Sequence, residues 1–138
     1  MDALVSTTAD PQRKTRTARV FVVEDSELIR ERLLSMLTGM SSVEVVGHAE
    51  TAADAIAGIL AARPDVVVLD IKLKAGSGIE VLRTIKRRFA KPAVIMLTNY
   101  ATEVYRSKCL EAGAEYFLDK TNEFEQLRPI IDELKRTQ

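Results

Sequence analysis

The chain has 138 residues, which suffice for one domain with a hydrophobic core but not comfortably for two. Hydrophobic residues make up 46% of it and charged residues 29%, and the formal net charge is zero. This composition is ordinary for a globular protein, and a net charge of zero gives no general electrostatic reason to bind nucleic acid. Partners therefore have to be inferred from particular sites.

The sequence carries no sign of export or of membrane insertion. No apolar stretch approaches the roughly eighteen residues of a membrane span, and the N-terminus lacks the apolar core of a signal peptide. The single cysteine, Cys109, has no second cysteine for a disulfide and no companion pattern for zinc, which favours a reducing compartment. We therefore expect a cytoplasmic protein that makes no membrane contact.

The N-terminal segment differs in composition from the rest of the chain. Residues 1–17, MDALVSTTADPQRKTRT, are small, polar and locally basic, without a sustained hydrophobic period. We expect residues 1–17 to form a mobile tail and residues 18–138 to form the folded domain. The basic run is short and lacks interleaved aromatic residues, so we interpret it as a solubilising feature and not as a nucleic-acid-binding arm.

From residue 19 onward, apolar runs typical of strands alternate with amphipathic patterns typical of helices. Thr51 and Asp54 form a start resembling a capping box for one helix, and Gly39 and Gly113 end two others. Strands and helices that alternate over short connections favour an α/β fold, a parallel sheet covered by helices on both faces. The expected strands are 19–24, 43–49, 66–69, 92–98 and 114–119, and the expected helices are 26–37, 52–62, 78–89, 102–112 and a last one from Asn122.

Polar residues stand where the expected strands end. Glu24 and Asp25 end the first strand, Asp70 ends the third, Thr98 ends the fourth and Lys120 follows the fifth. In open parallel sheets, functional groups collect at the carboxyl ends of strands, near the point where the strand order reverses. We therefore expect these five residues to converge on one rim of the sheet.

Three carboxylates on one rim repel each other, and Lys120 offsets them only in part. A metal ion is the expected missing charge. Because all the candidate ligands are oxygens, a hard ion such as Mg2+ fits better than zinc, with Mn2+ as an alternative. Magnesium completes its shell with phosphate oxygens, which leaves one carboxylate free to act as a nucleophile. Asp70, at the end of a strand that is apolar throughout, is the candidate nucleophile.

Four stretches together resemble the response-regulator receiver domain of two-component signalling: VVEDSELIRERL, PDVVVLDIKLKAGSGIEVL, AVIMLTNYA and GAEYFLDK. The resemblance extends from about residue 19 to residue 135. It implies a doubly wound, five-stranded parallel sheet of order 2-1-3-4-5, the flavodoxin-like receiver fold. It also implies that Asp70 accepts a phosphoryl group from the phosphohistidine of a sensor histidine kinase or of a phosphotransfer protein.

The resemblance assigns roles to the other rim residues as well. Glu24 and Asp25 would hold Mg2+ with Asp70, directly or through water, and the backbone carbonyl of Lys72 would be a further ligand. Lys120 would pair with the acceptor carboxylate and, after transfer, with a phosphoryl oxygen. Such a domain is not a conventional enzyme, although it catalyses its own phosphorylation and dephosphorylation.

Output is expected to start at a two-state element near the acceptor. The Thr98 hydroxyl would move toward the phosphoryl oxygens, and Phe117, the aromatic at the family's switch position, would change rotamer with it. The signal would leave through the face of the fourth helix, fifth strand and fifth helix, toward a downstream protein or a second copy. Tyr100, Tyr105 and Tyr116 are candidates for an aromatic patch on this partner surface.

Three positions depart from the family's pattern. Glu24 stands where the family often has a second aspartate, and Lys74 and Thr121 stand where it often has prolines. Without a proline at position 74, we expect the loop between Asp70 and the next helix to be looser.

Several alternatives stay open. The chain ends directly after the last expected helix, which favours a stand-alone receiver, while a truncated N-terminal part of a DNA-binding transcription regulator is an alternative. In both cases we expect no direct nucleic-acid contact by this domain. A receiver that binds its partner without phosphorylation is a further alternative. A phosphatase-like hydrolase is disfavoured because Lys72 stands where its second acid belongs, and a flavodoxin-like binder is disfavoured because the loop VEDSEL is acidic.

Overall fold

The computed structural model describes residues 17–136, so the tail expected over residues 1–17 lies, except for Thr17, outside the described residues. Within them, strands and helices alternate along the chain as expected. The strands are β1 (Ala18–Val23), β2 (Val43–Ala49), β3 (Val66–Leu69), β4 (Ala93–Thr98) and β5 (Tyr116–Asp119). The helices are α2 (Glu27–Thr38), α3 (Ala52–Ala62), α4 (Gly78–Arg88), α5 (Glu103–Glu111), the 3-10 turn η1 (Phe124–Gln126) and α6 (Leu127–Arg136).

The strands form one sheet of order β2-β1-β3-β4-β5, and each neighbouring pair is parallel. The expected fold class and strand order are therefore confirmed. Val23 at the end of β1 lies opposite Leu69 at the end of β3, and Thr98 at the end of β4 lies opposite Asp119 at the end of β5. This register brings the residues that follow β1, β3 and β5 to the same edge of the sheet.

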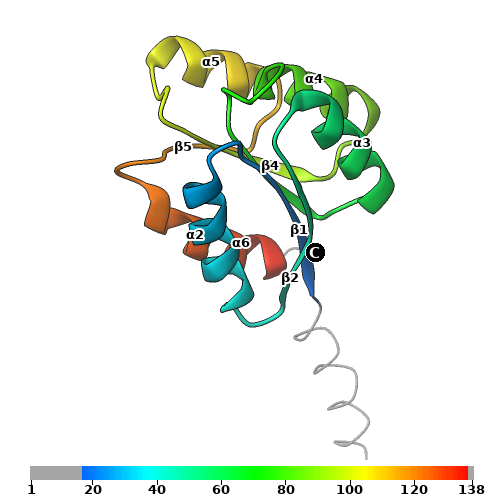
Figure 1. The fold of residues 1–138 in the computed structure, drawn as a ribbon, viewed down its shortest axis with the longest axis vertical. Helices are drawn as coiled ribbons and strands as arrows, with labels where there is room; N and C mark the ends of the chain where they lie inside the picture. The colour runs from blue at the N-terminus through cyan, green and yellow to red at the C-terminus, as the bar shows by residue number, and fades with distance from the viewer. Residues whose placement is uncertain (1–16, 137–138) are drawn as a thin grey trace, which may run out of the picture.

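Helices cover both faces of the sheet, with α2 and α6 on one side and α3, α4 and α5 on the other (Figure 1). Alternate residues of the strands point to the two sides: Val67 and Leu69 pack toward α3–α5, and Val66 and Val68 pack toward α2 and α6. Every residue of β3 is buried, as its uninterrupted apolar run predicts for a central parallel strand. Two separate cores thus clamp the central strand that leads to Asp70.

Hydroxyl side chains start the helices nearest the rim. Ser26 accepts a hydrogen bond from the backbone N–H of Ile29 at the start of α2, and Ser77 accepts one from Ile79 at the start of α4. The predicted cap of α3 is confirmed, because the Thr51 hydroxyl accepts a hydrogen bond from the Asp54 backbone N–H at 3.1 Å. These caps fix where the loops that carry the polar rim residues end.

The expected start of the last helix at Asn122 is wrong, because α6 begins at Leu127 after the short turn η1. The intervening residues are held by side chains: Asp119 accepts from the Thr121 N–H, and Glu123 accepts from the Asp119 N–H. Pro129 then falls in the first turn of α6, where a missing N–H costs no helical hydrogen bond. In a helix that began at Asn122, Pro129 would stand beyond the first turn, where its missing N–H would cost a helical hydrogen bond.

Candidate functional site

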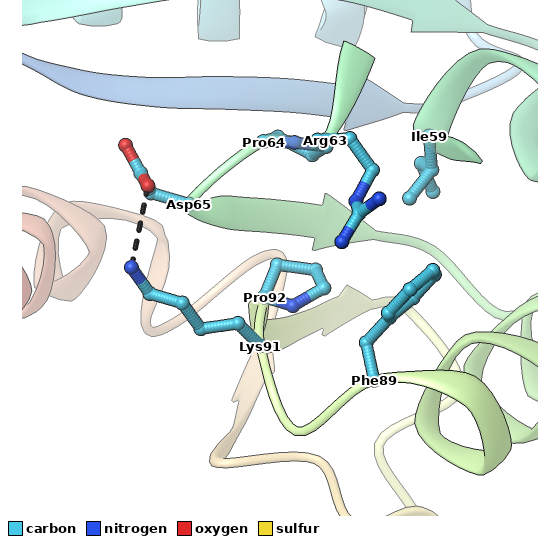
Figure 2. A pocket seen from close by; sticks show the side chains of 7 residues that line it. All are labelled: Ile59, Arg63, Pro64, Asp65, Phe89, Lys91 and Pro92. Carbon is cyan, nitrogen blue, oxygen red and sulfur yellow. Dashed lines mark ion pairs between the residues drawn. The ribbon is translucent and has the colours of Figure 1, made fainter. Parts of the chain in front are cut away.

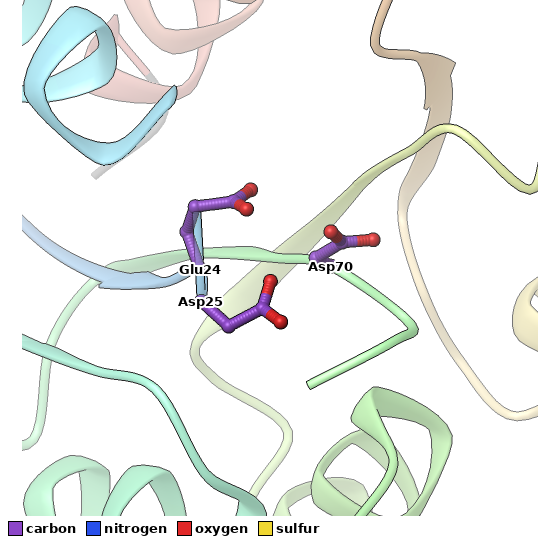
Figure 3. A group of neighbouring side chains, drawn as sticks. All are labelled: Glu24, Asp25 and Asp70. Atoms are coloured by element: carbon purple, nitrogen blue, oxygen red, sulfur yellow. The ribbon is translucent and has the colours of Figure 1, made fainter. Parts of the chain in front are cut away.

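Carboxylates from two central strands meet at the carboxyl edge of the sheet. Glu24 and Asp25 follow β1, and Asp70 follows β3. One oxygen of each of these three carboxylates lies within 4.8 Å of the others (Figure 3). Glu24 and Asp70 are buried, whereas Asp25 is exposed. The structure therefore assembles the acidic cluster that the strand ends predict.

Lys120 links two of the three carboxylates. Its Nζ lies 2.7 Å from Oδ2 of Asp70 and 2.9 Å from Oε1 of Glu24, and only 6% of its side chain is exposed. Burial lowers the pKa of Lys120, but the hydrogen bonds and charges of Asp70 and Glu24 outweigh it and raise the pKa overall. Lys120 is therefore charged at neutral pH and joins the ends of β1, β3 and β5.

Glu24 is the most deeply buried member of the cluster, with 1% of its surface exposed. Its Oε2 accepts a hydrogen bond from the Ser26 N–H at 3.0 Å, while its Oε1 faces Lys120. Burial raises the pKa of Glu24, and the contacts with Lys120 and Ser26 oppose that shift without cancelling it. A further positive charge near Glu24 would favour its ionised form.

Hydrogen bonds hold both the backbone and the side chain of Asp70. Its N–H donates to the Val23 carbonyl at 3.1 Å, and its Oδ1 accepts from the Ile71 N–H at 2.6 Å. The carbonyl of Ile71 in turn accepts from the Gly78 N–H at 2.7 Å. Because each oxygen of a carboxylate has two lone pairs, Oδ1 and Oδ2 keep acceptor capacity beyond Ile71 and Lys120.

Gly78 is a positioning residue that our sequence reasoning missed. A Cβ at this position would overlap the carbonyl oxygen of Asp70 and approach its carbonyl carbon at 2.8 Å. Only a residue without a side chain fits there. The available signal was a glycine opening an amphipathic helix, a position where almost any other residue favours the helix more.

Backbone hydrogen bonds connect the loop after Asp70 to the segment after β2. The Lys74 N–H donates to the Glu50 carbonyl at 3.0 Å, and the Ala52 N–H donates to the Ala75 carbonyl at 2.9 Å. A proline at position 74 has no N–H and could not make the first of these bonds. These two bonds tie the loop to the segment after β2, a restraint that the sequence did not predict, while the expected looseness of the loop stays a prediction.

Thr98 lies at the end of β4 and is fully buried. Its Oγ1 accepts from the Tyr100 N–H at 3.1 Å, and its carbonyl accepts from the Lys120 N–H at 2.9 Å. Thr98 thus joins the loops after β4 and β5, and its hydroxyl proton is available to a further acceptor.

The residues expected to carry output lie on both sides of the sheet. Phe117 is 4% exposed and packs in the core under α3–α5, with the Arg106 guanidinium 5.6 Å from its ring centroid. Tyr100 and Tyr105 make an edge-to-face pair with centroids 6.5 Å apart. Tyr116 packs partly against the core on the opposite face and lines a hollow with Arg106 and Leu110 of α5, so a shared surface of the three tyrosines stays a prediction.

The cluster fits a hard divalent cation. Three carboxylates and one ammonium carry a net charge of about −2 when all are ionised. All the acidic donors are oxygens, which Mg2+ and Mn2+ prefer. Lys72, the expected carbonyl ligand, forms an isolated bridge with Ser77, and its Nζ lies 5.6 Å from the Tyr100 ring centroid.

A separate cavity of about 170 Å3 lies at the opposite edge of the sheet, where β3 and β4 begin (Figure 2). The Arg63 guanidinium stacks over the Phe89 ring at 4.2 Å, and Lys91 pairs with Asp65 at 3.5 Å. Because the strands are parallel, this cavity is a full strand length from the carboxylates and takes no part in their chemistry.

The fold and the rim residues define a class of protein, and comparison with known proteins agrees. A family model described as "Response regulator receiver domain" matches residues 20–132. The chain belongs to the response-regulator receiver family. Homologues are response regulators of two-component signalling, and receiver domains of this family generally bind Mg2+ and interact with histidine kinases.

Two curated relatives and two solved structures illustrate the similarity. The chain is 37% identical to the DNA-binding transcriptional activator DevR/DosR of Mycobacterium tuberculosis over 102 residues, 74% of this chain and 47% of that one. It is 32% identical to the response regulator protein VraR of Staphylococcus aureus over 123 residues, 88% and 56% of the two chains. The chain therefore spans about half the length of these relatives.

Among solved structures, the response regulator domain of Thermotoga maritima CheB has a TM-score of 0.77 and 30% identity, covering 88% of this chain and 96% of that one. A LuxR-family two-component response regulator from Aurantimonas has a TM-score of 0.81 and 26% identity, covering 88% and 87%. Over residues 17–136, no helix has both the length and the apolar character needed to cross a membrane.

Proposed function

We propose that this domain is a phosphoacceptor switch in which Asp70 takes a phosphoryl group from the phosphohistidine of a sensor histidine kinase or phosphotransfer protein. The observation that carries the proposal is the Lys120 ammonium, 2.7 Å from the Asp70 carboxylate within an acidic cluster that also needs a cation. A strand-end aspartate with a merely structural role would not require a buried lysine and two neighbouring carboxylates.

In this reaction one Asp70 oxygen forms a bond to phosphorus, and the bond from phosphorus to the histidine nitrogen breaks. The electron pair of that bond goes to the imidazole, whose other ring nitrogen carries a proton, so the products are an acyl phosphate and a neutral histidine. Phosphoryl transfer depends chiefly on in-line placement and on stabilising charge at the three outer oxygens. The hydrogen bond from the Ile71 N–H to Oδ1 fixes the direction in which Asp70 presents its lone pairs.

Glu24, Asp25 and Asp70 would hold Mg2+, with the Lys72 carbonyl as a further ligand and Mn2+ as a substitute of the same donor preference. When bound, the ion supplies positive charge against the phosphoryl oxygens. Lys120 would leave Oδ2 of Asp70 for a phosphoryl oxygen, since the Asp70 oxygens of the acyl phosphate no longer carry the carboxylate charge and are weaker acceptors.

The added group brings up to about two negative charges and three strong acceptors to the rim. Thr98, whose hydroxyl proton is available, would donate to one of these oxygens and pull the loops after β4 and β5 inward. Phe117 would respond as the switch residue, and α5, β5 and α6 would present the changed face to a protein partner or to a second copy.

A second proposal concerns output. The relative DevR/DosR is named as a DNA-binding activator, and the chain covers about half of it. This supports a role as the regulatory half of a DNA-binding regulator in the cytoplasm, with no nucleic-acid contact by the receiver domain itself. The mass of the endogenous protein on an immunoblot tests it: a band near 15.3 kDa contradicts the proposal, and one about twice as heavy supports it.

The first experiment is the intact mass of the protein after incubation with Mg2+ and a small phosphodonor. We expect a gain of one phosphoryl group in wild type and in Asp54→Asn, and none in Asp70→Asn or in the presence of chelator. Asp54 is an exposed carboxylate outside the acidic cluster, which makes it the matched control. No gain in wild type, together with no response to a stable phosphoryl mimic, would favour a phosphorylation-independent interaction module.

A further inference from the structure

Glu50 joins three segments that surround the acidic cluster. It follows β2, and its Oε2 lies 3.3 Å from Nη1 of Arg30 in α2, while its Oε1 lies 3.5 Å from Nζ of Lys74. Its backbone carbonyl also accepts from the Lys74 N–H at 3.0 Å. Lys74 belongs to the loop that leaves Asp70. The Glu50 side chain is 35% exposed, so it stands at the border between the rim and solvent.

The contact with Arg30 leads directly to the cluster. The same nitrogen that faces Glu50, Nη1 of Arg30, donates to the backbone carbonyl of Glu24 at 3.1 Å. The Arg30 side chain is 13% exposed, whereas the Lys74 side chain is 71% exposed. Because solvent screens exposed ion pairs strongly, the pair with Arg30 is the energetically important one.

We propose that Glu50 is a positioning residue that sets the affinity of the acidic cluster for a divalent cation, by neutralising Arg30 and holding it on the Glu24 carbonyl. This inference rests on the proposed function, because it concerns the same metal site. Without the Glu50 carboxylate, Arg30 keeps its charge and its contact with the Glu24 carbonyl no longer has a second anchor, so the guanidinium can turn toward the carboxylates of the cluster. A guanidinium there competes with a divalent cation for the same negative charge.

The hydrogen bond between Glu50 and the loop does not depend on the Glu50 side chain. The Lys74 N–H that binds the Glu50 carbonyl comes from the peptide backbone and persists when the side chain is replaced. Substitutions of the Glu50 side chain therefore leave the loop after Asp70 anchored. This makes Glu50→Gln a clean change of charge, with little change in shape or in backbone hydrogen bonding.

The test is a Mg2+ titration of the unphosphorylated protein, followed by amide chemical shifts of the rim residues or by calorimetry. We expect Glu50→Gln to raise the Mg2+ dissociation constant about tenfold, the lower end for outer-shell partners of metal ligands. Asp54→Asn removes an equal charge from the same hollow beside Glu50 and Lys74, and we expect a change of less than about twofold. Equal effects of Glu50→Gln and Asp54→Asn would overturn the inference.

The Arg30→Met background distinguishes this role of Glu50 from a merely structural one. If Glu50 acts through Arg30, Glu50→Gln has less than about a twofold effect on Mg2+ affinity in the Arg30→Met background, because no free guanidinium remains to compete. An undiminished tenfold effect in that background contradicts the inference. If wild type binds Mg2+ through Asp25 and Asp70 and Glu50→Gln binds it equally well, the inference about Glu50 fails while the proposed function stands. If wild type binds no Mg2+, the metal site in the proposed function fails with it.

Discussion

Gly78 packs directly on the peptide group of Asp70, at a distance that leaves no room for a side chain. We expect Gly78→Ala to lower the free energy of unfolding by about 2 kcal/mol, because a methyl group there forces the α4 start and the Asp70 backbone apart. We also expect it to slow phosphoryl acceptance, although it leaves the Asp70 carboxylate chemically unchanged. Denaturant unfolding and intact mass measure the two effects.

Gly39→Ala is the matched control for that substitution. Gly39 caps α2 with a φ of −82°, and a Cβ there would meet its nearest atom at an ordinary 3.5 Å. We expect a stability within about 0.5 kcal/mol of wild type, or a small gain from the reduced freedom of the unfolded chain. Equal losses for the two variants would show that general glycine effects, and not the contact with Asp70, explain Gly78.

Lys120→Met tests the ammonium that links the strand ends. Removing it leaves two buried carboxylates, Asp70 and Glu24, without their shared cation, and we expect about 3 kcal/mol less stability in chelator. Lys74→Met should cost less than about 0.5 kcal/mol, because that lysine is 71% exposed. Urea unfolding compares them. A loss no larger for Lys120→Met than for Lys74→Met would mean that the buried pair contributes nothing beyond a surface contact.

The sequence predicted the sheet well because its signals are local and strong. Apolar runs such as 66–69 identify buried strands, and a residue that follows such a strand has only one edge of a parallel sheet to occupy. This is why the sequence predicts that Glu24, Asp25, Asp70 and Lys120 lie together. Their convergence follows from strand polarity together with the strand order β2-β1-β3-β4-β5.

Features that depend on contacts between loops were beyond such reasoning. The anchoring of the loop after Asp70 depends on the Lys74 N–H meeting the Glu50 carbonyl, 24 residues earlier in the chain, and the sequence has no period that records this. By contrast, strand alternation predicts that Tyr116 and Phe117 point to opposite faces of the sheet, and they do. Pro129 does indicate the start of α6, because a proline is tolerated in the first turn of a helix and not in its interior.

Cys109 gives the domain a predictable alkaline sensitivity. Burial raises the pKa of its thiol from 9.0 to about 11. Between these values the folded state holds a proton that the unfolded state loses, so stability falls as pH rises, by at most about 1.4 kcal/mol per pH unit. Relative to Cys109→Ala, wild type should therefore lose about 2 kcal/mol of its advantage between pH 8 and pH 10.5. Urea unfolding measures both proteins. A difference in unfolding free energy between wild type and Cys109→Ala that stays constant from pH 8 to pH 10.5 would rule the linkage out.

Glu24→Gln should separate stability from metal affinity. Burial raises the pKa of Glu24, so the folded state binds its proton more readily than the unfolded state, and the ionised side chain costs stability at neutral pH. We expect the glutamine variant to be more stable than wild type at pH 7 in chelator, with a difference that shrinks as pH falls below the raised pKa. Its Mg2+ affinity should drop by about tenfold or more, since one anionic donor is lost.

The control for this trade-off is Glu44→Gln, an exposed carboxylate on β2 for which we expect no change in either quantity. Unfolding in chelator at several pH values and Mg2+ titration at pH 7 give the two readouts for both variants. A glutamine variant at position 24 that is less stable at neutral pH would mean that the pair with Lys120 outweighs the burial of Glu24. Unchanged Mg2+ affinity would remove Glu24 from the metal site and leave Asp25 and Asp70 as its only carboxylates.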